Sequence, residues 1–141
     1  MHPILRNSLA VLAGLVVGNV INMGIVMISG SVIPPPEGAD VTTAEGLQAS
    51  IHLFEAKHYI FPFLAHALGT LAGALVAALI GINRKLTVAM IIGGFFLIGG
   101  ILAAVMIPAS PWFVVIDLLL AYLPMAWLGA RIVLFKKRMK T

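Results

Sequence analysis

Apolar segments alternate with short polar segments along the chain, and four of the apolar segments are long enough to cross a membrane. A bilayer core needs about 20 helical residues, and each of the four supplies at least that many. Because every backbone polar group in lipid must be satisfied internally, each segment is expected to be a helix. The sequence therefore predicts an all-α integral membrane protein, a single domain over residues 1–141 that forms an antiparallel bundle of four transmembrane helices. The spans are predicted over residues 8–33, 59–82, 86–107 and 113–135.

The first apolar segment runs from Ser8 to Ile33 without a charged residue, and three prolines, Pro34 to Pro36, follow it. Proline lacks a backbone donor and disfavours helix in the residue before it, so this helix is expected to end here. A cleaved signal peptide, with Arg6 before the apolar run, is the alternative. The run is much longer than the usual ~7–15 residues of such peptides, which favours a retained span.

The second helix is predicted to extend beyond the membrane on the outer side. Thr42 and Glu45 have the spacing of a capping box, which places the helix start near Thr43. A continuous helix from there to Ile82 would be about 60 Å long, roughly twice the thickness of the hydrocarbon core. Residues 34–58 are therefore expected to form an outer loop and a helix extension.

Composition rules out a water-soluble fold. Hydrophobic residues make up 61% of the chain and charged residues 10%, and the mean hydropathy is +1.09. A soluble domain keeps about a quarter of its residues charged. The chain has no cysteine, which excludes disulfides and thiolate metal sites. The net charge of +4 does not indicate nucleic acid, because the basic residues lie at the ends of apolar segments, where they orient helices and meet lipid headgroups.

The placement of basic residues predicts the orientation of the chain. Of nine positive charges, only Lys57 falls on the side of the bilayer opposite to the two termini. Four acidic residues accompany it: Glu37, Asp40, Glu45 and Glu55. Since Lys and Arg favour the cytoplasmic side, both termini are expected there, in a multi-pass protein of the cell membrane, of the bacterial inner-membrane type.

Small residues recur at every fourth position in three of the spans. The stripes are Ala10-Gly14-Gly18, Ala65-Gly69-Gly73-Ala77, and Ala89-Gly93 followed by Gly100-Ala104. Residues four apart share a helix face, and small side chains let two helix backbones approach closely. Packing within one bundle is the first interpretation of these stripes. A homo-oligomer interface, formed by the stripe on the third span, is the alternative.

Two ionisable residues, His66 and Asp117, lie inside predicted spans. Counted inward from the outer edge, both lie roughly 8–10 Å deep at 1.5 Å per residue. Ionisable groups are costly in lipid and usually face a partner or a water-filled cavity, so we expect these two to contact each other. Other polar residues fall on the same helix faces and are expected to line an outward-open polar cleft: Asn19, Asn22, Tyr59, Thr70, Glu55 and His52. Simple cross-linking of helices, at about 0.6 kcal/mol per bond, is the alternative.

The favoured function is the binding or conduction of a small solute or proton through this cleft, because histidine changes its charge near neutral pH. The alternative is a non-catalytic accessory subunit of a larger membrane complex. The least favoured is a metal-dependent membrane enzyme. Glu55 and His58 have the Glu-x-x-His spacing of di-iron bundles, but such sites need two copies and further glutamates. No cofactor or nucleic-acid partner is predicted, and the expected partners are the lipid bilayer and, alternatively, further copies of the chain.

Overall fold

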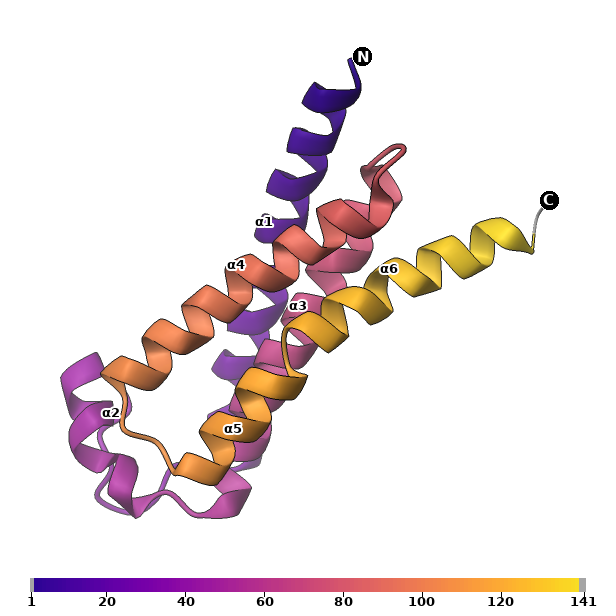
Figure 1. Ribbon diagram of the computed structural model, residues 1–141. Helices are drawn as coiled ribbons and strands as arrows, with labels where there is room; N and C mark the ends of the chain where they lie inside the picture. The colour runs from indigo at the N-terminus through magenta and orange to yellow at the C-terminus, as the bar shows by residue number, and fades with distance from the viewer. Residues whose placement is uncertain (1, 140–141) are drawn as a thin grey trace.

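The computed structural model describes residues 2–139 and is all-helical. Helices make up 82% of it, the described part contains no strand, and four helical stretches are long and apolar enough to span a membrane. The predicted helical class and the number of long apolar helices are therefore confirmed (Figure 1). The elements are α1 (Pro3–Val32), α2 (Ala44–Ser50), the 3-10 helices η1 (Ile51–Leu53) and η2 (Ala56–Tyr59), α3 (Ile60–Ile80), α4 (Lys85–Met106), α5 (Pro111–Leu120) and α6 (Leu123–Arg138).

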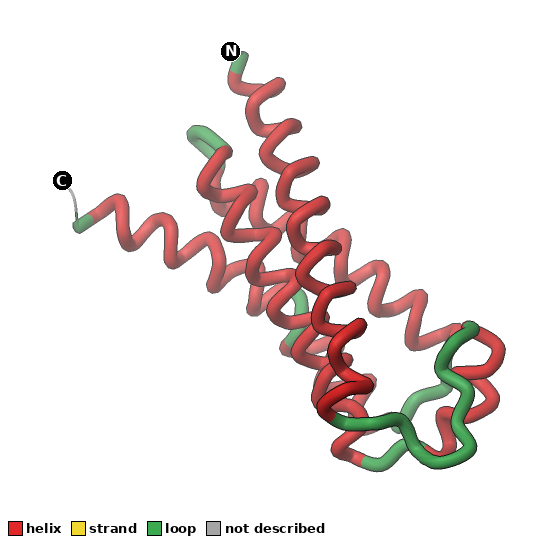
Figure 2. Tube along the Cα trace, turned by 180° about the vertical axis from the view of Figure 1, so that it is seen from behind, coloured by secondary structure: helices red, strands yellow, loops and turns green. Residues whose placement is uncertain are grey.

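Helix α3 is the centre of the arrangement, since it packs against α1, α4 and α6. Its buried face consists almost entirely of small residues: Ala65, Ala67, Gly69, Thr70, Gly73, Ala74, Ala77 and Ala78. Small side chains on this face allow three neighbouring helices to lie close to one central helix. Figure 2 shows α1 lying along the other helices on the side opposite to the view of Figure 1.

Glycines bring α1 and α3 into direct backbone contact. A Cβ atom on Gly14 would lie 2.6 Å from the carbonyl oxygen of Gly73, and one on Gly18 would lie 2.8 Å from the carbonyl oxygen of Gly69. The predicted stripes on the first and second spans therefore pack against each other within the chain. The stripe on the third span is also covered, because α6 lies against Gly93.

The prediction of one long second helix is wrong. Helix α2 ends at Ser50, and two 3-10 turns precede α3, which begins at Ile60. The backbone of Phe54 and Glu55 is extended between these turns, with ψ angles of 129° and 170°. The turns let Phe54 pack with Ile51 against the end of α5, and this apolar packing outweighs the local preference for a continuous helix.

The predicted capping box of Thr42 and Glu45 is wrong, because a simple N-cap at Thr43 takes its place. Thr43 is the N-cap, and its side chain accepts the backbone N–H of Gly46 at 2.9 Å. The hydroxyl of Thr42 instead donates to Asp40. The predicted helix start near Thr43 is confirmed, while the residue that caps it is not the predicted one.

The fourth apolar segment is two helices rather than one. Helix α5 ends at Leu120 and α6 begins at Leu123, with Tyr122 in a non-helical conformation (φ −116°, ψ −81°). Pro124 explains the break, because it has no N–H to donate to the carbonyl of Leu120 and is tolerated only in the first turn of α6. Helix α6 packs against α3 and α4, whereas α5 diverges from α4 (Figure 1).

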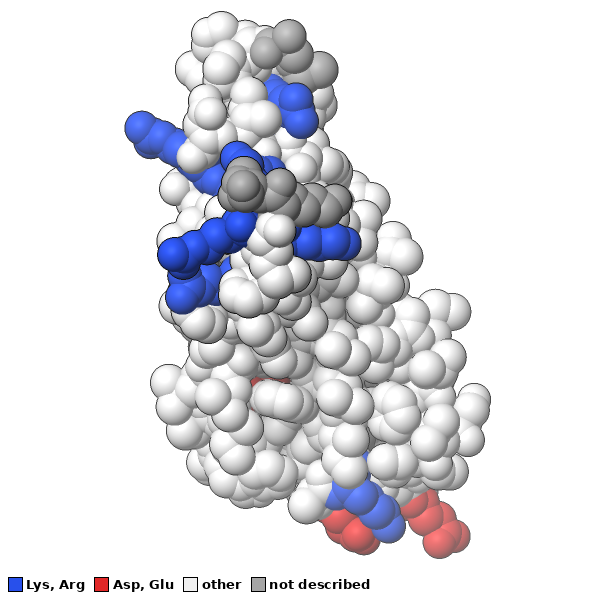
Figure 3. Space-filling model, turned by 90° about the vertical axis from the view of Figure 1, so that its right-hand side faces the viewer, with Lys and Arg blue, Asp and Glu red and all other residues white. Residues whose placement is uncertain are grey.

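On the face shown in Figure 3, charged side chains gather towards the two ends of the molecule, and the surface between them is almost free of charge. The end with both termini also carries the turn between α3 and α4 (Figure 1). Here Arg6 donates to the carbonyl of Ile80 at 2.8 Å, and the ammonium group of Lys85 donates to those of Ala78 and Gly81 at 2.6 and 2.7 Å. These cations satisfy the unpaired carbonyls at the end of α3 and complement its dipole.

Candidate functional site

His66 of α3 and Asp117 of α5 are in contact, which confirms the predicted pairing. Nδ1 of His66 lies 2.8 Å from Oδ1 and 3.0 Å from Oδ2 of Asp117. The Asp117 side chain is 6% exposed and the His66 side chain 25% exposed. The pair joins the central helix to the diverging helix α5, at a position where the carboxylate is almost fully covered.

Tyr122 is a third member of this cluster, and the sequence interpretation missed it. Its hydroxyl donates to Oδ2 of Asp117 at 2.8 Å, and its ring centroid lies 5.6 Å from that of His66. In an unbroken helix Tyr122 would lie about 140° around the axis from Asp117, on a different face. The break between α5 and α6 brings the two together. Pro124 was the sequence signal for it.

A cavity of about 240 Å³ borders His66 and Asp117. It lies in the space between α4 and the diverging α5. Its polar side chains are His66, Asp117 and Tyr59. The wall is otherwise apolar and includes Gly100, Ala103 and Ala104 of α4, Val114 and Leu118 of α5, and Ile51 of η1. The cavity is therefore an apolar space with an ionisable pair at its edge.

Residues 44–59, which we call the covering segment, close one end of the cavity. Ile51 and Tyr59 of this segment form a buried apolar cluster with Phe113 of α5. The rings of Tyr59 and Phe113 stack with their centroids 4.5 Å apart, and the Tyr59 hydroxyl shares a hydrogen bond with the Ser110 side chain at 3.3 Å. Tyr59 thus fixes the covering segment on α5.

A turn before α2 is hydrogen-bonded to the middle of the covering segment. The backbone N–H of Asp40 donates to the hydroxyl of the buried Ser50 at 2.9 Å. The carboxylate of Asp40 accepts the hydroxyl hydrogen and the backbone N–H of Thr42. Both hydrogen bonds lower the pKa of Asp40 below its usual value, and the one from the Thr42 hydroxyl has the larger effect. The carboxylate is therefore ionised at neutral pH and accepts both bonds.

The residues on α1 and deep in α3 that were predicted to line the cleft lie elsewhere. Asn19 is exposed, and its side-chain amide donates to the carbonyl of Leu15 at 2.8 Å. Asn22 packs beside Gly69. Thr70 is fully buried, and its hydroxyl has no hydrogen-bond partner in the described part of the chain. None of the three side chains lines the cavity, which is apolar where a polar lining was predicted.

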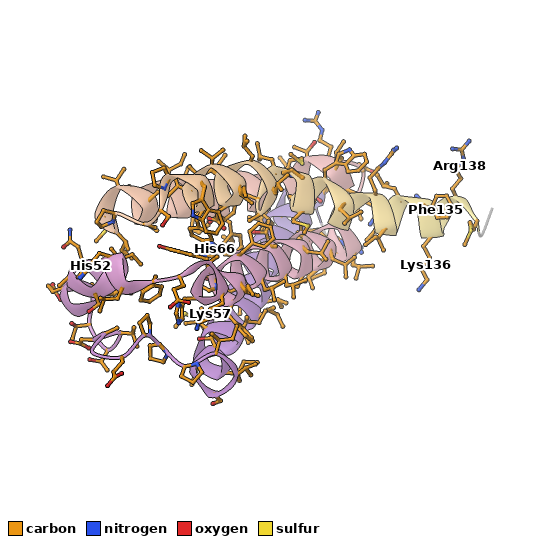
Figure 4. The ribbon with its side chains drawn as sticks, turned by 90° about the horizontal axis from the view of Figure 1, so that it is seen from below. His52, Lys57, His66, Phe135, Lys136 and Arg138 are labelled. Atoms are coloured by element: carbon orange, nitrogen blue, oxygen red, sulfur yellow. The ribbon has the colours of Figure 1, made fainter. Side chains whose placement is uncertain are left out.

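Glu55 and His52 lie in the exposed part of the covering segment, and neither lines the cavity. Figure 4 shows His52 at the far end of the molecule, well away from His66. Glu55 forms an exposed ion pair with Lys57 at 3.2 Å. These side chains therefore face solvent and do not form the mouth of a cleft.

The Glu55-x-x-His58 spacing, the candidate metal motif, forms a helix cap in the structure. Nδ1 of His58 accepts the backbone N–H of Glu55 at 2.9 Å, and the Glu55 carboxylate accepts the backbone N–H of His58. This reciprocal pair is a capping box at the start of η2. Residues 2–139 contain no group of three or more His, Asp or Glu side chains that could hold a metal ion.

A substitution of Gly100 tests how tightly Tyr122 is held. A Cβ atom at Gly100 would overlap the hydroxyl and ring of Tyr122. We expect Gly100→Ala to displace this ring, break its hydrogen bond to Asp117 and lower the free energy of unfolding by about 1–3 kcal/mol, measured by denaturant titration in lipid micelles. Gly99→Ala is the control, because beyond its own helix turn no described atom lies within 4 Å of the added carbon. Equal stability of the two variants would show that Tyr122 moves freely.

Comparison of the chain with known protein families, curated proteins and solved structures finds no match. The function is therefore argued from the site itself. The cluster of His66, Asp117 and Tyr122, which we call the trio, is held together by hydrogen bonds, and two of its members, His66 and Asp117, lie at the edge of an apolar cavity.

Proposed function

We propose that the four long helices cross the cell membrane, of the bacterial inner-membrane type, as an antiparallel bundle with both termini in the cytoplasm. Large apolar side chains are exposed along all four helices, as a lipid environment requires. Helix α1 buries only Ala10, Gly14 and Gly18. The end with the termini carries most of the Lys and Arg side chains, which agrees with the positive-inside rule (Figure 3).

We further propose that the cavity binds a small, mostly apolar molecule that carries one polar group. The observation that carries this proposal is the ionisable pair of His66 and Asp117 at the edge of an otherwise apolar space. Ionisable groups within a membrane are costly and mark functional sites. An engineered apolar cavity of about 150 Å³ in another protein binds benzene, whereas pockets for drug-sized ligands measure about 300–1,000 Å³. A cavity of about 240 Å³ therefore suits a molecule with one ring.

Binding fits the geometry better than conduction across the membrane. Beyond His66, towards the end that carries the termini, the core is closed by fully buried residues: Ala67, Thr70, Ile92 and Ala126. None of these side chains is ionisable and the hydroxyl of Thr70 is the single polar group among them, whereas polar solutes and protons need a succession of polar groups or water along their path. The cavity is therefore proposed as a binding site that is closed on the cytoplasmic side.

A non-catalytic subunit of a larger membrane complex is the second candidate. It is favoured by α1, which contacts the rest of the chain along one narrow stripe and leaves its other faces uncovered. Recovery of one fixed partner protein at constant stoichiometry after mild detergent extraction would support this candidate.

Filling the cavity tests the binding function. Ala104 lines the cavity, whereas its neighbour Val105 is 79% exposed and does not. We expect at least one of three probes, 4-fluorophenol, 4-fluorotoluene and 4-fluorobenzaldehyde, to bind the wild-type protein saturably in lipid nanodiscs, observed by fluorine NMR. Because a phenyl group would occupy the space, Ala104→Phe should weaken binding by about tenfold or more, and Val105→Phe should leave it unchanged. Equal binding by both variants would place the probes in the lipid and refute the proposal.

A further inference from the structure

The hydrogen bonds of the trio fix which atom of His66 can meet a ligand. The Tyr122 hydroxyl donates its single hydrogen to Asp117. Nδ1 of His66 lies 2.8 and 3.0 Å from the two oxygens of the same carboxylate, the position of an N–H shared between them. A neutral imidazole that donates from Nδ1 to a carboxylate keeps a lone pair on Nε2, whereas an imidazolium donates from both nitrogens. In the neutral form, Nε2 of His66 is then a hydrogen-bond acceptor.

This acceptor is oriented before any ligand arrives and has no partner within the described part of the chain. None of the hydrogen bonds formed by residues 2–139 involves Nε2 of His66. The ring is held by Asp117 on one side and lies 5.6 Å from the Tyr122 ring. His66 lines the cavity, and a quarter of its side chain is exposed. An unpaired acceptor beside an apolar space favours a ligand that brings a donor.

We propose that the ligand is recognised by a hydroxyl group that donates to Nε2 of His66, so the ligand class is a small phenol or an alcohol of similar size. A carbonyl compound offers only an acceptor, and a hydrocarbon offers neither donor nor acceptor. The remainder of the ligand is apolar, because the wall around it is formed by residues such as Ala103, Val114 and Leu118. This inference rests on the proposed binding function and names the ligand class for the same cavity.

The three fluorinated probes share one ring and differ in the group that would meet His66. 4-Fluorophenol carries a hydroxyl, 4-fluorotoluene a methyl group of similar size, and 4-fluorobenzaldehyde an acceptor alone. Dissociation constants are measured by fluorine NMR with the full-length protein in nanodiscs and corrected for partition into protein-free nanodiscs. We expect the wild-type protein to bind 4-fluorophenol about tenfold more tightly than 4-fluorotoluene, as one added hydrogen bond allows. In His66→Phe this preference should disappear while 4-fluorotoluene still binds.

A second measurement uses the wild-type protein alone, in case His66→Phe does not fold. The nitrogen NMR signal of Nε2 of His66 should shift on addition of 4-fluorophenol and stay in place with 4-fluorotoluene. The signals of the remote residues His52 and His58 serve as internal controls. Equal affinity for the phenol and the toluene, or tighter binding of the aldehyde, would overturn hydroxyl recognition and leave the cavity as a binding site. Failure of all three probes to bind saturably would overturn the binding function itself.

Discussion

Gly14→Val is expected to separate α1 from α3 and to lower the free energy of unfolding by about 3 kcal/mol or more. The first added carbon alone would lie 2.6 Å from the carbonyl oxygen of Gly73 and 3.0 Å from side-chain carbons of Ala77 and Ile92. A backbone carbonyl within a helix cannot rotate away, so the whole of α1 must move outward. Because helices in lipid associate through close packing, this movement removes the main contact of α1. Unfolding by denaturant titration in mixed micelles, followed by circular dichroism, measures the loss.

Gly24→Val is the matched control on the same helix. Beyond the neighbouring residues and backbone of its own helix, no described atom lies within 4 Å of the carbon added there, so this variant should unfold like the wild-type protein. The comparison removes the general effect of replacing glycine by a branched residue in a helix. If the two variants were equally stable, the backbone contact at Gly14 would contribute nothing to the association of α1 with α3.

The four long helices could be predicted because uncharged length alone distinguishes a membrane-spanning segment. The interruptions of these helices were harder to predict. Pro124 disfavours a continuous helix, yet the apolar residues on both sides of it fit a single span. The turn at Phe54 depends on packing against Phe113, more than fifty positions later in the sequence. No local pattern contains that contact.

The pairing of His66 with Asp117 could be predicted because both fall inside apolar segments, where an ionisable group is costly, and at equal distances from the expected outer edge of these segments. Tyr122 could not be added to the pair, because its position depends on the break in the fourth segment. The position of the Asn19 side chain is determined by the glycine stripe on α1, which packs against α3. Asn19 lies about 100° around the helix from Gly18, so it points away from α3 when Gly18 meets that helix. Helical periodicity defines a face, but it does not say which neighbour that face meets.

Asp117→Leu is expected to lower the free energy of unfolding by about 2–4 kcal/mol, because Asp117 accepts the hydroxyl hydrogen of Tyr122 and contacts His66. Leucine keeps the branched shape of the aspartate side chain but is larger and has no acceptor, and Tyr122 is only 1% exposed, so its hydroxyl would be left without a partner. Asp117→Asn should cost less, since the amide oxygen still accepts one hydrogen bond. Denaturant titration in micelles should therefore give the highest free energy of unfolding for the wild type, a lower one for Asp117→Asn and the lowest for Asp117→Leu.

A double-mutant cycle separates loss of the hydrogen bond from a general disturbance of the site. His66→Phe and Asp117→Leu are measured singly and together, and the combined loss should fall short of the sum by about 1–3 kcal/mol, because each single variant already removes the contact at 2.8 Å. Ile116 is an exposed neighbour of Asp117, and Ile116→Leu combined with His66→Phe should be additive. If the losses in the free energy of unfolding were also additive for His66→Phe and Asp117→Leu, the contact between the imidazole and the carboxylate would contribute no stability. The orientation of Nε2 towards a ligand would then have no physical basis.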